Sequence, residues 1–171
     1  MPMELLYVYP WVALTAFLTF IIHELAHKIS AEYYGLEAHY KANVIMLLIS
    51  LAASLTGYLF FLGGAVVIEG GPYDKKENGI IAMAGPLSNI TIAAIIVSIK
   101  FFTYLLPIEP FLDALFLMNA LIAIYNMLPF YIFDGKKVFH WNKAVWVCLI
   151  ATAIALMVLN YRFFYNSLLF L

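Results

Sequence analysis

The sequence predicts an all-α polytopic membrane protein of about five hydrophobic segments, with a core of three helices and a short membrane-associated β or re-entrant element. Composition supports this class, because 65% of the 171 residues are hydrophobic and only 11% are charged. The mean hydropathy of +0.96 lies far above that of soluble domains. We expect a single integral-membrane domain over residues 1–171, surrounded by the lipid bilayer.

Charge and cysteine content exclude several kinds of protein. Nine basic residues are balanced by ten acidic ones, so no basic patch for nucleic acid is expected. Cys148 is the only cysteine, which excludes an intramolecular disulfide and a cysteine cluster around a metal. The oligomeric state is not readable from these properties.

Charge-free stretches long enough to cross a bilayer, about 18 to 20 residues, define the segments. They cover residues 5–22, 42–68, 79–99, 114–133 and 144–161. From them we predict core helices over about 5–29, 79–104 and 111–137 and a final helix over about 144–163. Glu4 replaces the basic residues that begin a secretory signal, so we expect the first helix to be retained.

The second segment, about residues 42–70, differs from the others in its glycine content. Val66, Val67 and Ile68 are β-branched and lie between paired glycines, which favours an extended strand. Irregular backbone at membrane depth requires a cover of protein or a watery cavity. We therefore expect a re-entrant segment ending in a strand; an ordinary helix with a glycine-rich loop is the alternative.

The first segment ends in the pentapeptide His23-Glu24-Leu25-Ala26-His27. On a helix, histidines four residues apart project from one face and can bind one zinc ion, with the glutamate close to a zinc-bound water. An HExxH pattern alone is weak evidence and can arise by chance. Here it continues an apolar segment, where an unpaired charge costs on the order of a few kcal/mol, so the sequence favours a metal site.

A catalytic zinc needs a third protein ligand and one open position. Asp134 is the best candidate, since it closes the fourth apolar segment between the helix breaker Pro129 and the turn residue Gly135. A helix cap or an interfacial charge is the structural alternative for this aspartate. His39 and His140 are competing ligands in polar connections.

Two amides, Asn89 and Asn126, lie in apolar surroundings. Asn89 follows the pair Gly85-Pro86, which we expect to open the third helix. A buried amide needs hydrogen-bond partners, and the backbone of a bound peptide is one such partner. Hydrogen bonding between helices is an equally good explanation for either residue alone.

These motifs together resemble the site-2 protease family of intramembrane zinc metalloproteases. HELAH is followed by AGPLSN and then by NMLP and DG, and the match spans about residues 17–137. The resemblance implies one zinc ion per chain and roles for six residues: zinc ligands His23, His27 and Asp134, catalytic glutamate Glu24, and site-lining amides Asn89 and Asn126. At Ile132 and Lys136 the chain departs from the proline and second glycine common in the family, which concerns loop geometry more than catalysis.

The proposed ligands constrain the membrane topology. If they bind one metal, the ends of the first and fourth segments meet on the same side of the membrane, which requires a re-entrant second segment. That arrangement gathers on one face the lysines Lys28, Lys41, Lys75, Lys76, Lys136, Lys137 and Lys143. The other face carries Glu4, Glu109 and Asp113, with Lys100 and Arg162. Because cytoplasmic loops are rich in lysine and arginine, we predict a multi-pass cell-membrane protein with its site toward the cytoplasm.

The sequence therefore predicts a zinc metalloendopeptidase that hydrolyses peptide bonds within or near transmembrane segments of other membrane proteins. Gly64, Ala65 and Val66 are expected to bind an extended substrate by backbone pairing. One alternative is a non-proteolytic metal-binding membrane protein, either a divalent-cation transporter or an inactive scaffold, which does not need Glu24. Another uses a glutamate as the third ligand, with the candidates Glu32, Glu37, Glu69, Glu77 and Glu109.

Overall fold

The computed structural model describes residues 3–45, 64–69, 74–103, 109–130 and 133–168. The elements in chain order are α1 (Met3–Tyr33), β1 (Glu37–Ala42), β2 (Gly64–Glu69), α3 (Lys75–Thr103), α4 (Glu109–Asn126), α5 (Asp134–Trp141) and α6 (Lys143–Leu168). The protein is mostly helical with one small sheet, as the sequence predicts.

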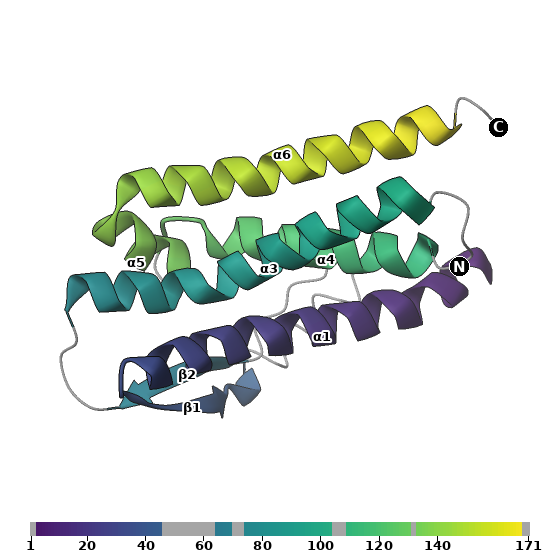
Figure 1. The fold of residues 1–171 in the computed structure, drawn as a ribbon. Helices are drawn as coiled ribbons and strands as arrows, with labels where there is room; N and C mark the ends of the chain where they lie inside the picture. The colour runs from purple at the N-terminus through teal and green to yellow at the C-terminus, as the bar shows by residue number, and fades with distance from the viewer. Residues whose placement is uncertain (1–2, 46–63, 70–73, 104–108, 131–132, 169–171) are drawn as a thin grey trace.

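The long helices α1, α3, α4 and α6 lie side by side and alternate in direction along the chain (Figure 1). α3 and α4 pack against each other in the middle. α1 contacts both of them from one side, and α6 contacts both from the other. The two-stranded sheet lies against α1.

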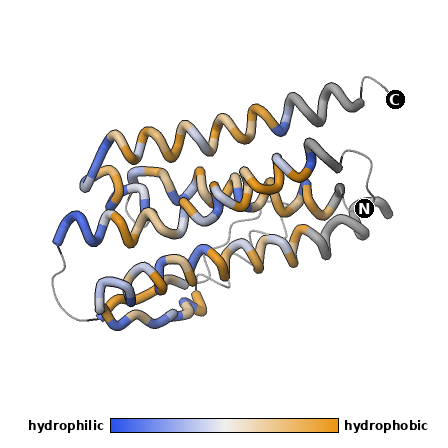
Figure 2. The backbone as a smooth tube through the Cα atoms, viewed as in Figure 1, coloured by the Kyte–Doolittle hydropathy of each residue, from blue (hydrophilic) through white to orange (hydrophobic). Residues whose placement is uncertain are grey.

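Three helices in the described part of the chain are long and apolar enough to cross a membrane, over Val12–Tyr33, Lys75–Lys100 and Lys143–Tyr161. α4 supplies a shorter apolar helix, Phe111–Asn126. Hydrophobic residues run along these helices, and hydrophilic residues gather at the start of α3 (Figure 2). Many large apolar side chains are exposed on the bundle, among them Phe17, Ile29, Ile95, Val147 and Val158. Such exposure fits a membrane protein, because hydrocarbon does not penalise it as water does.

The third helix begins earlier than the sequence analysis expected. The Gly85-Pro86 pair does not open it; α3 starts at Lys75 and runs through Pro86. The start is set by a capping box, in which Asp74 Oδ1 accepts the Glu77 N–H at 2.9 Å and Glu77 Oε2 accepts the Asp74 N–H at 3.4 Å. A proline inside a helix is tolerated in this setting because neighbouring helices and side chains satisfy the freed backbone groups.

The expected core helix over residues 111–137 is divided into α4 and α5. α4 ends at Asn126, and Pro129 lies in the break, where its ring prevents continuation of the helix. The Met127 carbonyl in this break accepts a hydrogen bond from the Trp146 indole of α6 at 2.7 Å. Gly135 packs directly on the Met127 backbone, and a Cβ at residue 135 would overlap it. These contacts fix the position at which α5 begins.

The predicted strand over Val66–Ile68 is confirmed as part of β2. It pairs antiparallel with β1, and Tyr40 lies opposite Val66. The strand β1 was not predicted, because the segment EAHYKA lacks the β-branched pattern of a strand. Most of the expected re-entrant segment, residues 46–63, lies outside the described residues, so its course stays a prediction.

α1 ends and α3 begins at the same end of the bundle, next to the sheet (Figure 1). The last residue of α1 and the first residue of α3 therefore lie at one end of the bundle. α4 also ends there, and α5 and the start of α6 lie at that end as well. This arrangement brings the HELAH motif of α1 close to the start of α5.

Candidate active site

His23, His27 and Asp134 form a compact buried cluster at this end of the bundle. Their side chains come from adjacent turns of α1 and from the first residue of α5, and their residues are 2%, 7% and 9% exposed. His27 Nε2 lies 3.1 Å from His23 Nε2 and 2.9 Å from Asp134 Oδ2. His23 Nε2 lies 3.3 Å from the same oxygen.

These separations fit a tetrahedral metal site. Zinc bonds of about 2.0 to 2.2 Å place the ligand atoms of a tetrahedron about 3.3 to 3.6 Å apart, so a bound ion requires these atoms to move apart by only a few tenths of an ångström. Two imidazoles and a carboxylate are also a donor set used by catalytic zinc, and they leave one position open. The structure thus holds a possible zinc site at His23, His27 and Asp134.

The outer nitrogen of each imidazole is already hydrogen-bonded. His27 Nδ1 donates to the Ile81 carbonyl at 2.7 Å, and His23 Nδ1 lies 2.6 Å from Asn89 Oδ1. Nε2 of each ring is therefore the nitrogen that faces the cluster. Such outer partners hold metal-binding histidines in orientation and raise their affinity for the ion.

Gly85 of α3 lies against both imidazoles. A Cβ at this residue would overlap Nε2 of His27 and Nε2 of His23. The space beside the two nitrogens is therefore kept open by the absence of a side chain. A metal bound to these nitrogens requires that space.

The Asp134 carboxylate is held in its ionised form. Burial alone raises the pKa of this carboxyl, but its interactions with His27 and His23 and the nearby Lys137 ammonium lower the pKa well below its usual range. Lys137 Nζ lies 3.4 Å from Asp134 Oδ1, the oxygen that does not face the histidines. An ionised carboxylate is the form that binds a metal ion.

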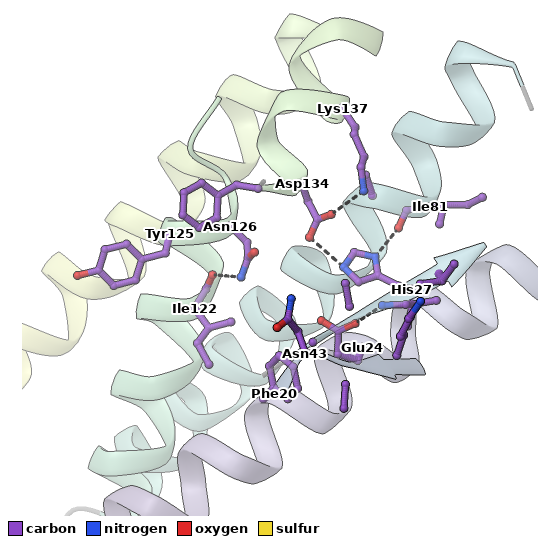
Figure 3. A pocket seen from close by; sticks show the side chains of 18 of the residues that line it. Phe20, Glu24, His27, Asn43, Ile81, Ile122, Tyr125, Asn126, Asp134 and Lys137 are labelled. Atoms are coloured by element: carbon purple, nitrogen blue, oxygen red, sulfur yellow. Dashed lines mark hydrogen bonds and ion pairs between the residues drawn. The ribbon is translucent and has the colours of Figure 1, made fainter. Parts of the chain in front are cut away.

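Glu24 lies beside this cluster at the wall of a cavity of about 860 Å³. Its Oε2 accepts the backbone N–H of Val66 at 2.9 Å. Figure 3 shows Glu24, His27 and Asp134 converging at the cavity, with Asn126 and Tyr125 of α4 across from Glu24. The cavity thus joins the possible metal site to β2 and to an apolar wall of α1 and α4 lined by Ala16, Phe20, Met118, Leu121 and Ile122.

The residues expected to bind substrate fall into two groups. Gly64, Ala65, Val66 and Asn126 line the cavity, and the Asn126 amide donates to the Ile122 carbonyl at 3.0 Å. Asn89 is fully buried behind His23 and does not line the cavity. For Asn89 the structure favours the alternative of hydrogen bonding between helices.

The competing ligands lie elsewhere in the described residues. His39 faces Glu69 at 3.6 Å on the exposed surface of the sheet, and His140 Nδ1 is 2.7 Å from the Lys136 carbonyl. Neither belongs to a group of three potential ligands. The same holds for the glutamates whose side chains the structure describes, Glu32, Glu37, Glu69 and Glu77, whereas the side chain of Glu109 lies outside the described part.

Sequence reasoning missed the polar residues behind the histidines. Thr15 and Thr19 are fully buried and precede His23 at intervals of four residues, on the same face of α1. Asn119 is also fully buried and precedes Asn126 by two helical turns. A polar stripe at helical spacing within an apolar helix was the available signal in both cases.

Comparison with known proteins agrees with this chemistry. No model of a known protein family matches the sequence. The chain is 36% identical over 136 residues to the protein named "Putative zinc metalloprotease MJ0611" of Methanocaldococcus jannaschii, an alignment that covers 74% of this chain and 68% of that protein. It is 35% identical over 107 residues to "Uncharacterized protein MJ0971" of the same organism, of which the alignment covers 26%. Identity at this level over most of both chains shows that the protein belongs to the same family as the archaeal protein named as a zinc metalloprotease.

Proposed function

We propose that the protein is an intramembrane zinc endopeptidase of the site-2 protease type, which hydrolyses peptide bonds within or near transmembrane segments. The convergence of His23, His27 and Asp134 beside Glu24 carries this proposal. His23 and His27 lie inside Val12–Tyr33, one of the helices long enough to cross a membrane. The reaction site is therefore built into the apolar part of the bundle.

In the proposed reaction, His23, His27 and Asp134 hold one zinc ion. Zinc in such a site lowers the pKa of water to about 7 and polarises a carbonyl group. Glu24 takes the proton of the attacking water and delivers it to the leaving amine. The cavity beside Glu24 has the volume of a site that encloses a sizeable ligand.

We propose that the substrate binds to β2 as an added strand. Val66 donates its N–H to Glu24 rather than to Tyr40, its partner on β1. Along a strand of an antiparallel pair, the N–H and C=O groups of successive residues point alternately toward and away from the partner strand. The backbone groups of Gly64, Val66 and Ile68 therefore point away from β1. An unwound substrate segment can pair with this edge and place its carbonyl near the metal. The Asn126 amide at the opposite wall is available to contact the same segment.

We also propose that the protein lies in the cell membrane and that the end of the bundle with His23, His27 and Asp134 faces the cytoplasm. The described elements at this end carry several lysines: Lys28, Lys75, Lys76, Lys136, Lys137 and Lys143. The other ends of α3 and α4 carry Lys100, Glu109 and Asp113. This distribution favours a cytoplasmic site by the positive-inside rule.

The direct test compares wild type with Glu24→Gln for bound zinc and for cleavage of a model transmembrane substrate. Both proteins should bind one zinc ion per chain, because Glu24 lies outside the ligand set. The glutamine variant should lose cleavage by at least about 100-fold, since it cannot accept the proton. Two results together would support the alternative of a transporter or scaffold. Wild type would not cleave the substrate, and the Glu24→Gln variant would keep the zinc-dependent transport or partner binding of wild type.

A further inference from the structure

A chain of buried hydrogen bonds lies behind His23 and joins three helices. Thr19 of α1, Asn89 of α3 and Asn119 of α4 are each fully buried. Asn89 Nδ2 donates to Asn119 Oδ1 at 3.0 Å, and Asn119 Nδ2 donates to Thr19 Oγ1 at 3.0 Å. Asn119 Nδ2 also donates to the Leu115 carbonyl at 2.8 Å. None of these three side chains lines the cavity.

The Leu115 carbonyl determines which groups donate and which accept along this chain of hydrogen bonds. A backbone carbonyl can only accept, so the atom of Asn119 that faces it must be the NH2 group. Asn119 then presents its oxygen to Asn89, which must turn its own NH2 group toward Asn119. The Asn89 oxygen is left facing His23 Nδ1, 2.6 Å away.

This direction determines which nitrogen of His23 carries the hydrogen. An amide oxygen accepts only, so the hydrogen must be on Nδ1, and Nε2 is left for the cluster. If the Asn89 amide turned over, its NH2 group would face Nδ1, and the hydrogen of the neutral ring would move to Nε2. A hydrogen on Nε2 prevents that nitrogen from binding a metal.

We propose that Asn119 is a positioning residue that sets the tautomer of His23 through Asn89 without touching the site. The two histidines differ in this respect, because a backbone carbonyl, that of Ile81, holds His27 directly. His23 is held instead by the Asn89 side chain, whose NH2 group donates to Asn119 Oδ1 at 3.0 Å and, at the longer distance of 3.4 Å, to the Thr19 carbonyl. The inference rests on the proposed role of His23 as a metal ligand, but the direction of the hydrogen bonds can be measured independently.

The test is nitrogen NMR of the full chain in detergent, labelled with ¹⁵N-histidine, free of metal and recorded at alkaline pH. In wild type, His23 and His27 should both carry hydrogen on Nδ1. In Asn119→Leu, His23 should shift toward the Nε2–H form, while His27 remains unchanged as an internal reference. Zinc affinity, measured by competition with a chelator, should fall about 10- to 100-fold, as for other outer partners of metal-binding histidines.

Two control variants distinguish the effect of reversing the hydrogen bonds that lead to His23 from the effect of losing any one hydrogen bond of the network. Asn119→Asp keeps an oxygen toward Asn89, so His23 should retain hydrogen on Nδ1. Thr19→Val has nearly the same shape as threonine and removes a bond of the same network, but it leaves the Leu115 carbonyl in place. It should also leave the His23 tautomer unchanged.

Two results would overturn the proposal. One is a wild-type His23 with its hydrogen on Nε2, a measurement that needs no variant to fold. The other is an Asn119→Leu protein in which the His23 tautomer and the zinc affinity both match wild type. A wild type with hydrogen on Nδ1 that binds no zinc would instead contradict the proposed function and support the direction of the hydrogen-bond chain.

Discussion

At the scale of single residues, Gly85 lies so close to the two imidazoles that a side chain at this position would overlap both. A residue larger than glycine at position 85 of α3 would place its side chain in the space beside His23 Nε2 and His27 Nε2. Glycine costs up to about 1 kcal/mol inside a helix relative to alanine. Its presence within α3 is explained by the close approach of the helix to the two imidazoles, which leaves no room for a Cβ.

Gly85→Ala should therefore abolish zinc binding while raising the helix propensity of α3. The added methyl group collides with both ring nitrogens, so zinc content should fall to background in metal analysis of the purified protein. Gly79→Ala is the matched control, because it makes the same change in the same helix and collides with Trp141 instead. The control should lower thermal stability but keep zinc. Normal zinc content in Gly85→Ala would show that the metal lies elsewhere.

The sequence allowed the members of the cluster to be predicted, but not all of their partners. HELAH has a fixed helical spacing, and Asp134 follows a helix breaker, so the residue types and positions were sufficient. For Asn89 the sequence is compatible with a substrate contact and equally with hydrogen bonding between helices, because an isolated buried amide can have several partners. Its pairing with His23 depends on how α1 and α3 pack, which the order of residues does not reveal.

At the scale of elements, β2 connects the sheet to the site. Its Val66 N–H reaches Glu24, and its edge faces the cavity. The strand was predictable from its β-branched run, whereas β1 was not, because EAHYKA is polar and becomes a strand only by pairing with β2. The start of α3 differs from the prediction for another reason: the capping box at Asp74 begins the helix well before the Gly85-Pro86 pair, and Pro86 is accommodated inside it.

Val66→Pro tests the proposed docking of substrate on β2. Proline removes the outward N–H, which Glu24 accepts at 2.9 Å when no substrate is bound, without removing a hydrogen bond between β1 and β2, so the sheet should remain. Cleavage should fall about tenfold or more, the effect of one lost hydrogen bond of roughly 1.4 kcal/mol. Val66→Ala keeps the N–H and should stay close to wild type. Equal cleavage by the proline and alanine variants, both with normal zinc content, would remove the strand from the substrate site.

At the scale of the whole molecule, the two ends of the bundle differ. One end gathers the cluster, the sheet and most of the lysines of the described residues. Near the other end, Lys100 of α3 bonds to Asp113 of α4 and, at 3.0 Å, to Asn160 of α6. This polar contact joins three helices away from the site. The hydrophobic segments were readable from the sequence because membrane length and charge are properties of the chain itself.

Cysteine labelling tests the orientation of the bundle. In a Cys148→Ala background, single cysteines at Asp74 and Lys136 should both react with a membrane-impermeant reagent from the cytoplasmic side, since both positions are exposed at the same end. A cysteine at Lys143 provides a third position at that end. If the cysteines at positions 74 and 136 reacted from opposite sides of the membrane, the two positions could not lie at the same end of the bundle, and the proposed topology would be wrong.

The measurement that tests the account most directly is the zinc content and zinc coordination of wild type and Asp134→Ala. Wild type should bind one zinc ion per chain, with an X-ray absorption spectrum of two imidazole nitrogens and carboxylate or water oxygens at about 2.0 to 2.2 Å. Asp134→Ala should lose at least about 100-fold in zinc affinity, because it removes one of three ligands. Full zinc occupancy with an unchanged spectrum in Asp134→Ala would contradict the proposed site.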